Sequence, residues 1–316
     1  MLVCTMFTAV AGLIRLINIS VLKESSKEAQ KKEMDGIIET LISALKADTS
    51  PESDSMHDGF WKYNDTTING YSISIESLSG KINLNFFPSD IIAKTNLKEL
   101  FADPSGAASF MDSSEKLFYN YDEISDHLDE DNYNKYFTFH GWANYNLTDE
   151  SRVKQLLESL EVSGSSSFLA KRKSRLTNRQ YASTYADYRM ILGTGYKSIM
   201  PYVNLEPPVN VNFVDEQILK DILSYPKFKV SGINQKAESI ASLRESKEIT
   251  REQLDNILGT KNSNELYYLL GVKTYFYKVE IKGAAQHCSI IIARNINDSQ
   301  TDHKAGDWYL LEKKWI

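Results

Sequence analysis

The chain has 316 residues, which is enough for two or three compact units. Apolar residues make up 42% and charged residues 25%, which are ordinary globular values and exclude a largely disordered protein. The formal net charge of −6 gives no electrostatic argument for a nucleic-acid or acidic-lipid partner. The two cysteines, Cys4 and Cys288, can form at most one bridge, so disulfides do not provide the stabilising framework.

The N-terminal segment is apolar. Leu2–Ile14 carries no charge, Arg15 interrupts the run, and Leu16–Val21 completes it. A membrane span takes about 20 apolar residues, and an arginine at its centre costs about 2.5–3.5 kcal/mol. This composition predicts a weak membrane span. A secretory signal peptide is the alternative, although no basic segment precedes the apolar run and no clear small-residue cleavage site follows it.

A charged segment continues the same helix. Lys23–Lys32 contains no Pro or Gly, and apolar residues then recur on one helical face at Ile37, Ile38, Leu41, Ile42 and Leu45. The polar segment Asp48–Asp58 ends the helix. We therefore predict one long helix that is apolar at its start and amphipathic later. A signal-anchor followed by an unrelated amphipathic helix is the alternative.

Alternating apolar residues predict several strands. Tyr71–Ile75 and Ile82–Phe86 flank Ser79-Gly80, which we interpret as the turn of a hairpin. Further strands are expected at Val209–Phe213, Tyr275–Ile281 and Cys288–Ala293, with an edge strand at Trp308–Ile316. Because these strands are too few for two sheets, we expect one antiparallel sheet.

Helical patterns fill the long interval between the first and last strands. Tyr185–Leu192 is followed by a tight turn at Gly193–Gly195 and a short second helix. Thr250 with Gln253 predicts a capping box at a later helix, and Gly259 is well placed to end it.

Four segments, in order along the chain, resemble the K-type minor pseudopilins of bacterial type II secretion (the general secretion pathway protein K family). They are Ser79–Asn85 (SGKINLN), Asn178-Arg179 with Tyr185–Val203 (YADYRMILGTGYKSIMPYV), Pro208–Asn212 (PVNVN), and Val272–Val279 (VKTYFYKV) followed by Arg294. The residues that carry the resemblance are Gly80, Lys81, Asn83, Asn85, Asn178, Arg179, Asn210, Asn212, Tyr275, Phe276 and Arg294.

The resemblance implies an α+β fold with a long N-terminal helix, a pilin-like antiparallel sheet and a large helical insertion that is SAM-like or helix-hairpin-helix-like. The implied units are a membrane or stalk helix at 1–48, the first part of the head at 49–96, a first helical module at 97–206, a second at 207–262, and closing strands at 263–316. The asparagines of the two Asn-x-Asn motifs, Asn83, Asn85, Asn210 and Asn212, are interpreted as structural, because their amides can hydrogen-bond the backbone where a strand turns into a helix.

The resemblance also implies a function: capping the tip of the pseudopilus and initiating its assembly, without enzymatic activity. Implied partners are the I-type and J-type minor pseudopilins, the pseudopilus and the inner membrane, with a periplasmic head and with no nucleic acid or small-molecule substrate. The first helix has no acidic residue before Glu24, and K-type proteins likewise lack the acidic group near the start of this helix. Its expected membrane and partner contacts are Phe7, Val10, Leu13, Leu16 and Ile17.

Two parts of the family pattern are not matched. The start of the chain shows no basic leader ending in Gly, and Gly141–Asn144 corresponds poorly to the acidic stretch of the family. Calcium, which some members bind, is therefore unsupported by the loop pattern, and no cofactor is expected. The acidic segment around Asp129 and Asp131 fails as an EF-hand because His140 replaces the closing Glu.

A second functional class remains open. Gly193–Gly195 between two short helices is compatible with a helix-hairpin-helix turn that binds a DNA phosphate, with Lys171–Arg175 as a basic patch beside it. The five histidines show no zinc spacing, and the sequence contains no phosphate-binding loop or nucleophile elbow.

Overall fold

The computed structural model describes residues 2–50, 52–113, 116–260, 264–296 and 308–316, with side chains from residue 24 onward except at positions 113, 194 and 196. The α-helices are α1 Leu2–Lys46, α2 Ser89–Lys94, α3 Ala107–Ser113, α4 Glu130–Tyr136, α5 Glu150–Ser159, α6 Ser165–Thr177, α7 Tyr185–Leu192, α8 Tyr196–Ile199, α9 Glu216–Leu223, α10 Ile233–Ser246, α11 Arg251–Leu258 and α12 Glu265–Leu269. The strands are β1 Thr66–Ile68, β2 Tyr71–Ser77, β3 Ile82–Asn83, β4 Phe137–Thr138, β5 Ala143–Asn144, β6 Val203–Asn204, β7 Val209–Asn210, β8 Leu270–Gly271, β9 Phe276–Lys282, β10 His287–Arg294 and β11 Trp308–Trp315.

A five-stranded antiparallel sheet, in the order β1-β2-β9-β10-β11, forms the centre of the head. Strands β2 and β9 are neighbours in this sheet although the helical lobe separates them in sequence, and Ser77 lies opposite Tyr277. The lobe, which comprises α2 to α12, is therefore an insertion between two adjacent strands. The predicted α+β class, with its long first helix, antiparallel sheet and helical insertion, is confirmed.

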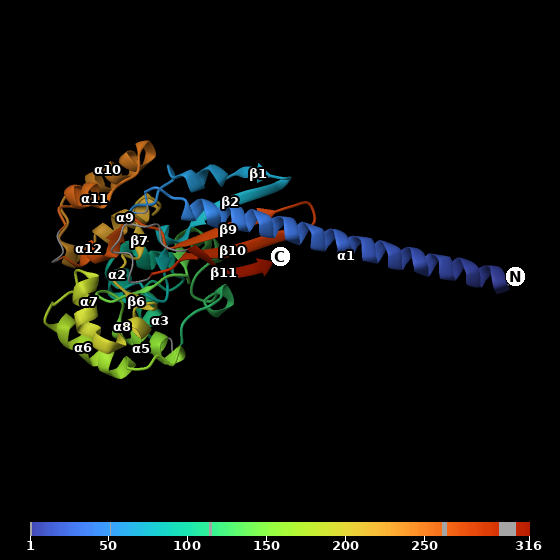
Figure 1. Cartoon of the computed structure of the whole chain (residues 1–316). Helices are drawn as coiled ribbons and strands as arrows, with labels where there is room; N and C mark the ends of the chain where they lie inside the picture. Colours follow the sequence, from blue (N-terminus) through green and yellow to red (C-terminus); the bar gives the residue numbers. More distant parts are fainter. Residues whose placement is uncertain (1, 51, 114–115, 261–263, 297–307) are drawn as a thin grey trace.

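Helix α1 has two parts (Figure 1). Its N-terminal part projects away from the head, and its C-terminal part lies along the sheet. The predicted apolar face is buried there: Ile37, Ile38, Leu41 and Leu45 pack against one face of the sheet together with Met34. Burial of this stripe fixes the helix on the head, because apolar area removed from water is the main favourable term in packing.

The two faces of the sheet contact different parts of the chain. Along β10, Ile290 and Ile292 belong to the core under α1, whereas Ile291 and Ala293 belong to a core shared with α5, α6 and α7. This division follows from the alternation of side chains along a strand. A third core, made by α2, α3, α9, α10 and α11, lies within the lobe.

The predicted hairpin at Ser79-Gly80 is wrong. Leu78–Gly80 forms one 3-10 turn, and β3 pairs in parallel with β4 rather than with β2. The side chain of Asn83 accepts hydrogen bonds from the backbone N–H groups of Asn85 and Phe86 (2.8 and 3.0 Å), which turns the chain after two strand residues. The predicted strands at Ile82–Phe86 and Val209–Phe213 therefore lie outside the five-stranded sheet, in separate two-stranded pairs.

Truncation of one buried α1 side chain tests the contact between helix and sheet. Leu41 is fully buried in this contact. Leu41→Ala should lower the free energy of unfolding by roughly 2–5 kcal/mol, because the cavity left by the removed side chain cannot close between the helix and the sheet. Urea denaturation measures the change, and Glu39→Ala, on the exposed side of the same helix, should stay within about 0.5 kcal/mol. Equal losses for both variants would contradict the packing described.

Candidate functional site

The two predicted Asn-x-Asn motifs occupy equivalent positions. Asn83 and Asn210 each sit at the end of a two-residue strand, and their side-chain oxygens accept the backbone N–H of Asn85 (2.8 Å) and Asn212 (2.9 Å). Such a turn, in which a side chain replaces a backbone acceptor, redirects the chain toward the following helix, α2 or α9.

A third copy of this motif was not predicted. Asn144 and Asn146 make the same turn, since the N–H of Asn146 donates to Asn144 Oδ1 at 2.9 Å, and β5 pairs in parallel with β6. The segment A-N-Y-N-L-T-D-E at 143–150 parallels V-N-V-N-F-V-D-E at 209–216. The spacing of the motifs, 61 residues from Asn83 to Asn144 and 66 from Asn144 to Asn210, is the sequence signal that identifies the repeat.

The second asparagine of each copy holds a distant backbone segment with two hydrogen bonds. Its amide donates to a carbonyl oxygen, and its oxygen accepts the N–H of the same residue. The pairs are Asn85 with Phe118 (2.9 and 2.8 Å), Asn146 with Ala182 (2.9 and 2.9 Å) and Asn212 with Ile249 (3.2 and 3.0 Å). We call each unit, with its turn and its two-bond anchor, an Asn clasp.

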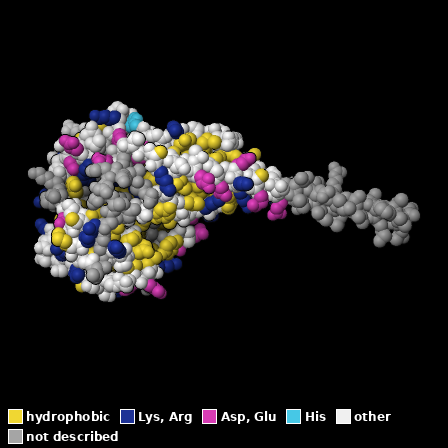
Figure 2. All heavy atoms as spheres, viewed as in Figure 1, with side chains coloured by type: hydrophobic (Ala, Val, Ile, Leu, Met, Phe, Trp, Pro, Cys, Tyr) yellow, Lys and Arg dark blue, Asp and Glu magenta, His cyan; other side chains and the backbone are white. Residues whose placement is uncertain are grey.

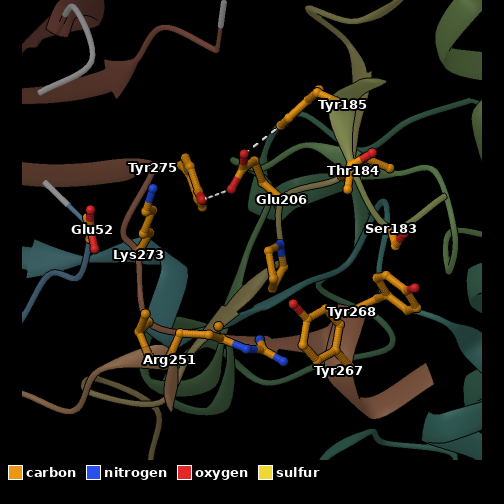
Figure 3. A pocket seen from close by; sticks show the side chains of 14 residues that line it. Glu52, Ser183, Thr184, Tyr185, Glu206, Arg251, Tyr267, Tyr268, Lys273 and Tyr275 are labelled. Carbon is orange, nitrogen blue, oxygen red and sulfur yellow. Dashed lines mark hydrogen bonds between the residues drawn. The ribbon is translucent and has the colours of Figure 1, made fainter. Parts of the chain in front are cut away.

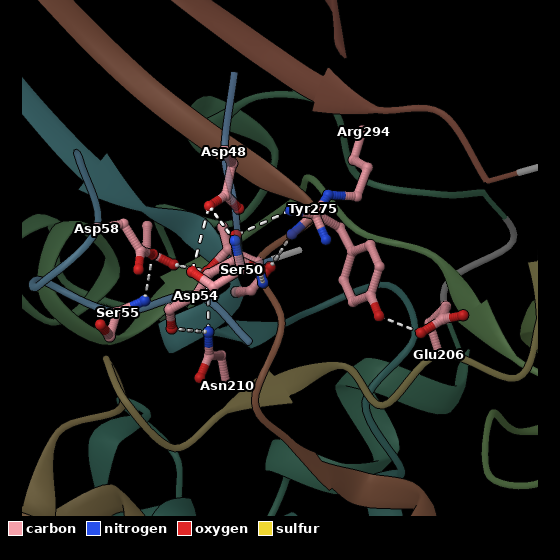
Figure 4. A network of polar contacts seen from close by, with 12 residues as sticks. Asp48, Ser50, Asp54, Ser55, Asp58, Glu206, Asn210, Tyr275 and Arg294 are labelled. Carbon is pink, nitrogen blue, oxygen red and sulfur yellow. Dashed lines mark hydrogen bonds and ion pairs between the residues drawn. The ribbon is translucent and has the colours of Figure 1, made fainter. Parts of the chain in front are cut away.

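A buried ion pair joins the segment after α1 to the sheet and the lobe (Figure 4). Arg294, at the end of β10, donates to Asp54 Oδ1 at 2.8 Å, and both side chains are 3% exposed. The second carboxylate oxygen of Asp54 accepts the N–H of Thr274 at 2.7 Å. The amide of Asn210 donates to the carbonyl of Asp54 at 3.1 Å and to the Thr274 hydroxyl at 3.0 Å. Segments far apart in sequence thus meet at one residue, Asp54.

Carboxylates gather beside this pair. A cavity of about 560 Å³ lies between the end of α1 and the lobe and is lined by Asp48, Asp54, Asp58 and Glu248. Burial, together with the nearby charges of Asp54 and Glu248, raises the pKa of Asp58 from 3.8 to about 7, although the N–H of Ser55 donates to it at 2.7 Å. Burial also raises the pKa of Asp54, against the effect of Arg294.

A second cavity, of about 230 Å³, lies between the second and third clasps (Figure 3). Glu206 points into it between two tyrosines, accepting hydrogen bonds from the hydroxyls of Tyr185 (2.8 Å) and Tyr275. Burial and the Glu206 charge hold the pKa of both phenols well above 10. Arg251 stacks on the Tyr267 ring at 3.7 Å at the opposite wall. Glu206 and Arg251 are thus both engaged, Glu206 by the two tyrosines and Arg251 by Asp255 at 2.8 Å, and the Glu206 contacts join segments that are remote in sequence.

The other residues of the predicted motifs lie in different places. Gly80 faces Phe213 so closely that an added Cβ would lie 2.7 Å from the Phe213 Cβ. Lys81 is buried and pairs with Glu76 at 2.6 Å. Asn178 and Arg179 are exposed at the end of α6, away from the Asp54 network. The structure thus brings Asn210, Tyr275 and Arg294 together and leaves Asn178 and Arg179 apart.

Asp54, Glu206, Asn144 and Asn146 are the site residues that the sequence prediction missed. Asp54 and Glu206 lie in polar connecting segments and carry no local signal, because their partners are remote in sequence. Within the described ranges, no group of three or more His, Cys, Asp or Glu is arranged to hold a metal ion. At the acidic segment tested above, Asp129 uses both oxygens to cap α4, accepting from the N–H and amide of Asn132 (2.8 and 2.7 Å).

The predicted membrane-facing side chains, Phe7, Val10, Leu13, Leu16 and Ile17, lie outside the described side chains. In the part of the chain that was described, no helix combines the length and apolar character needed to cross a membrane. Gly193–Gly195 forms a 3-10 turn between α7 and α8, and α8 has four residues.

No protein-family model and no curated protein matches this chain. Among solved structures, it is similar to a chain of the GspK–GspI–GspJ complex from the type 2 secretion system of enterotoxigenic Escherichia coli. The two chains are 12% identical, with a TM-score of 0.41, and the match covers 93% of this chain and 98% of the other.

Removing the anchor of the second clasp tests its role. Asn146→Ala leaves the N–H and carbonyl of Ala182 unpaired in a buried setting, so the free energy of unfolding should fall by roughly 2–3 kcal/mol. Asn178→Ala is the matched control, because that exposed side chain bonds only to the Ser174 carbonyl of its own helix. Chemical denaturation of both variants measures the difference, and a change in Asn146→Ala no larger than in the control would contradict the clasp.

The raised pKa of Asp58 predicts a pH dependence of stability. Between about pH 4 and 7 the folded state keeps a proton that the unfolded state has lost, so the free energy of unfolding decreases as pH rises through this window. The free energy of unfolding should fall less between pH 5 and 8 in Asp58→Asn than in the wild type, by about 1 kcal/mol when partial solvent screening is allowed for. Thermal unfolding at both pH values measures it. The exposed control Asp126→Asn should keep the wild-type pH profile, and an unchanged profile in Asp58→Asn would refute the assignment.

Proposed function

We propose that this chain is a minor pseudopilin of the K type, which caps the pseudopilus tip of a type II secretion system and initiates its assembly. The observation that carries the proposal is the continuity of α1. One part of the helix projects from the head, and the next part buries Ile38, Leu41 and Leu45 against the sheet (Figure 1). A helix built in this way can stay in a membrane or among partner helices while it holds a folded head outside.

The position of the lobe supports a cap rather than a repeating subunit. The lobe is inserted between β2 and β9 and is anchored to the sheet through Asp54, Arg294 and Asn210. Its bulk lies at the end of the head away from the N-terminus (Figure 1). A subunit stacked within a fibre must leave room for the head of the next subunit. A subunit at the tip has no neighbour beyond it and can carry a bulky lobe there.

The proposed partners are the I-type and J-type minor pseudopilins and the inner membrane. We expect the first helix to contact lipid and then neighbouring helices through Phe7, Val10, Leu13, Leu16 and Ile17. The head is proposed to lie in the periplasm and to act mechanically, without catalysis. The proposed units of the chain remain those inferred from the resemblance, with helical modules at 97–206 and 207–262.

Charged substitutions in the first helix test the proposal. Val10→Asp with Leu13→Asp should abolish membrane retention and secretion, because each carboxylate at membrane depth costs about 2.5–3.5 kcal/mol on insertion scales. Membrane fractionation and recovery of the other minor pseudopilins with the tagged chain are the measurements.

Ser25→Asp with Ser26→Asp is the matched control, since it adds the same charge to an exposed part of the same helix. It should leave fractionation and secretion unchanged. Normal secretion by the Val10/Leu13 variant would refute the proposal. Salt-sensitive binding of duplex DNA by a chain that does not fractionate with membranes would favour the helix-hairpin-helix alternative instead.

A further inference from the structure

Positive charge is concentrated in one part of the lobe. Residues 162–205 contain seven basic residues and one acidic residue, a net charge of 7 − 1 = +6. The whole chain carries −6, so the remaining residues carry −12. The basic residues are Lys171, Arg172, Lys173, Arg175, Arg179, Arg189 and Lys197, and the acidic residue is Asp187.

This segment, which contains α6, α7 and α8, lies in the part of the head away from the N-terminus of α1, below α12 in the view of Figure 1. Lys and Arg side chains are spread over that end of the surface (Figure 2). Lys171, Lys173, Arg179, Arg189 and Lys197 are exposed. Together with the exposed Met190 they define what we call the basic face.

Buried contacts hold the basic face in shape. Arg172, which is 3% exposed, points inward and donates to the carbonyls of Tyr145 (2.7 Å) and Thr148. The Tyr145 ring also packs against the Tyr188 ring of α7, with centroids 4.9 Å apart. Helices α6 and α7 therefore rest on one side chain next to the second Asn clasp. A surface held in this way needs little reordering to bind a partner.

Among the described residues, Lys171, Arg179 and Lys197 form no ion pair. Lys173 approaches Glu150 at 3.5 Å, but both side chains are largely exposed, and such pairs contribute little. Asp187, the one acidic residue of the segment, is engaged by the hydroxyl of Ser183 at 3.0 Å, which lowers its pKa. The segment therefore carries an excess of positive charge that can attract an acidic partner.

We propose that the basic face is a docking surface for an acidic segment of a protein partner. Met190, the neighbour of Arg189 on α7, is 76% exposed and offers an apolar contact beside the charges, a combination that protein interfaces use. A membrane surface fits less well, because a lipid-binding helix needs a broad apolar face. The inference stands independently of the proposed function.

Nucleic acid is the less suitable polyanion. The Gly193 N–H is already bonded to the Arg189 carbonyl, and α8 has only four residues, so the turn offers a poor cradle for a phosphate. The net charge of −12 on the rest of the chain would also repel a long duplex.

Charge reversal at three exposed positions tests the proposal. The variant Lys171→Glu, Arg179→Glu, Lys197→Glu is compared with Lys62→Glu, Lys247→Glu, Lys314→Glu, which makes the same change in net charge at exposed positions elsewhere. The probe is a fluorescent 12-residue polyglutamate peptide in low salt, measured by anisotropy with the full chain. We expect the first variant to bind at least about tenfold more weakly and the control within about twofold of wild type.

Three results would overturn the proposal. Equal losses in both variants would show that only net charge matters. Tighter binding of a 20-base-pair duplex or of anionic phosphatidylglycerol vesicles than of the peptide, lost in the same variant, would assign the face to nucleic acid or lipid. If the wild-type chain did not bind the peptide, the basic face would not be a docking surface for acidic segments. Circular dichroism of each variant checks that the fold is retained.

Discussion

The architecture depends on one buried ion pair, between Asp54 and Arg294. Their side chains are separated by 240 positions in sequence and are withdrawn from water, so each charge is tolerated only because the other is present. Thr274 and Asn210 satisfy the remaining hydrogen-bonding capacity around Asp54. The loop that leaves α1, the strands that close the sheet and the third Asn clasp therefore cannot move independently, and the pair sets the position of the first helix relative to the lobe.

Buried polar groups are paired with hydrogen-bond partners in the lobe as well. Each Asn clasp replaces a longer ladder of strand hydrogen bonds with a two-residue parallel pair and an asparagine that holds a remote backbone segment at both its N–H and its carbonyl. This arrangement lets short helices follow one another closely while few backbone groups remain unpaired. Similar clasps at three positions indicate that the lobe is assembled from related units, each connected to the next by a few residues.

Features encoded locally were predictable from the sequence. The apolar stripe of α1 at Ile37, Ile38 and Leu41 is buried as its helical spacing indicates, and Thr250 with Gln253 forms the expected capping box, with Gly259 ending the helix. The pairing of the strand after Ser79-Gly80 was not predictable, because the partner of β3 is β4, which lies more than fifty residues downstream and carries no signal of pairing. The Asp54–Arg294 pair was missed for the same reason: charge and sequence distance alone do not specify which buried partners meet.

The edges of the sheet limit where other chains can associate. Strand β1 has three residues, and β11 carries a bulge opposite Ile291 and Ile292 and has Lys313 and Lys314 near its end. Short edge strands, bulges and lysines all oppose edge-to-edge pairing. One face of the sheet is covered by α1 and the other by the lobe. Pairing through the strand edges is therefore disfavoured, and association with other proteins has to use side-chain contacts, such as those of the projecting part of α1 or of the surface of the lobe.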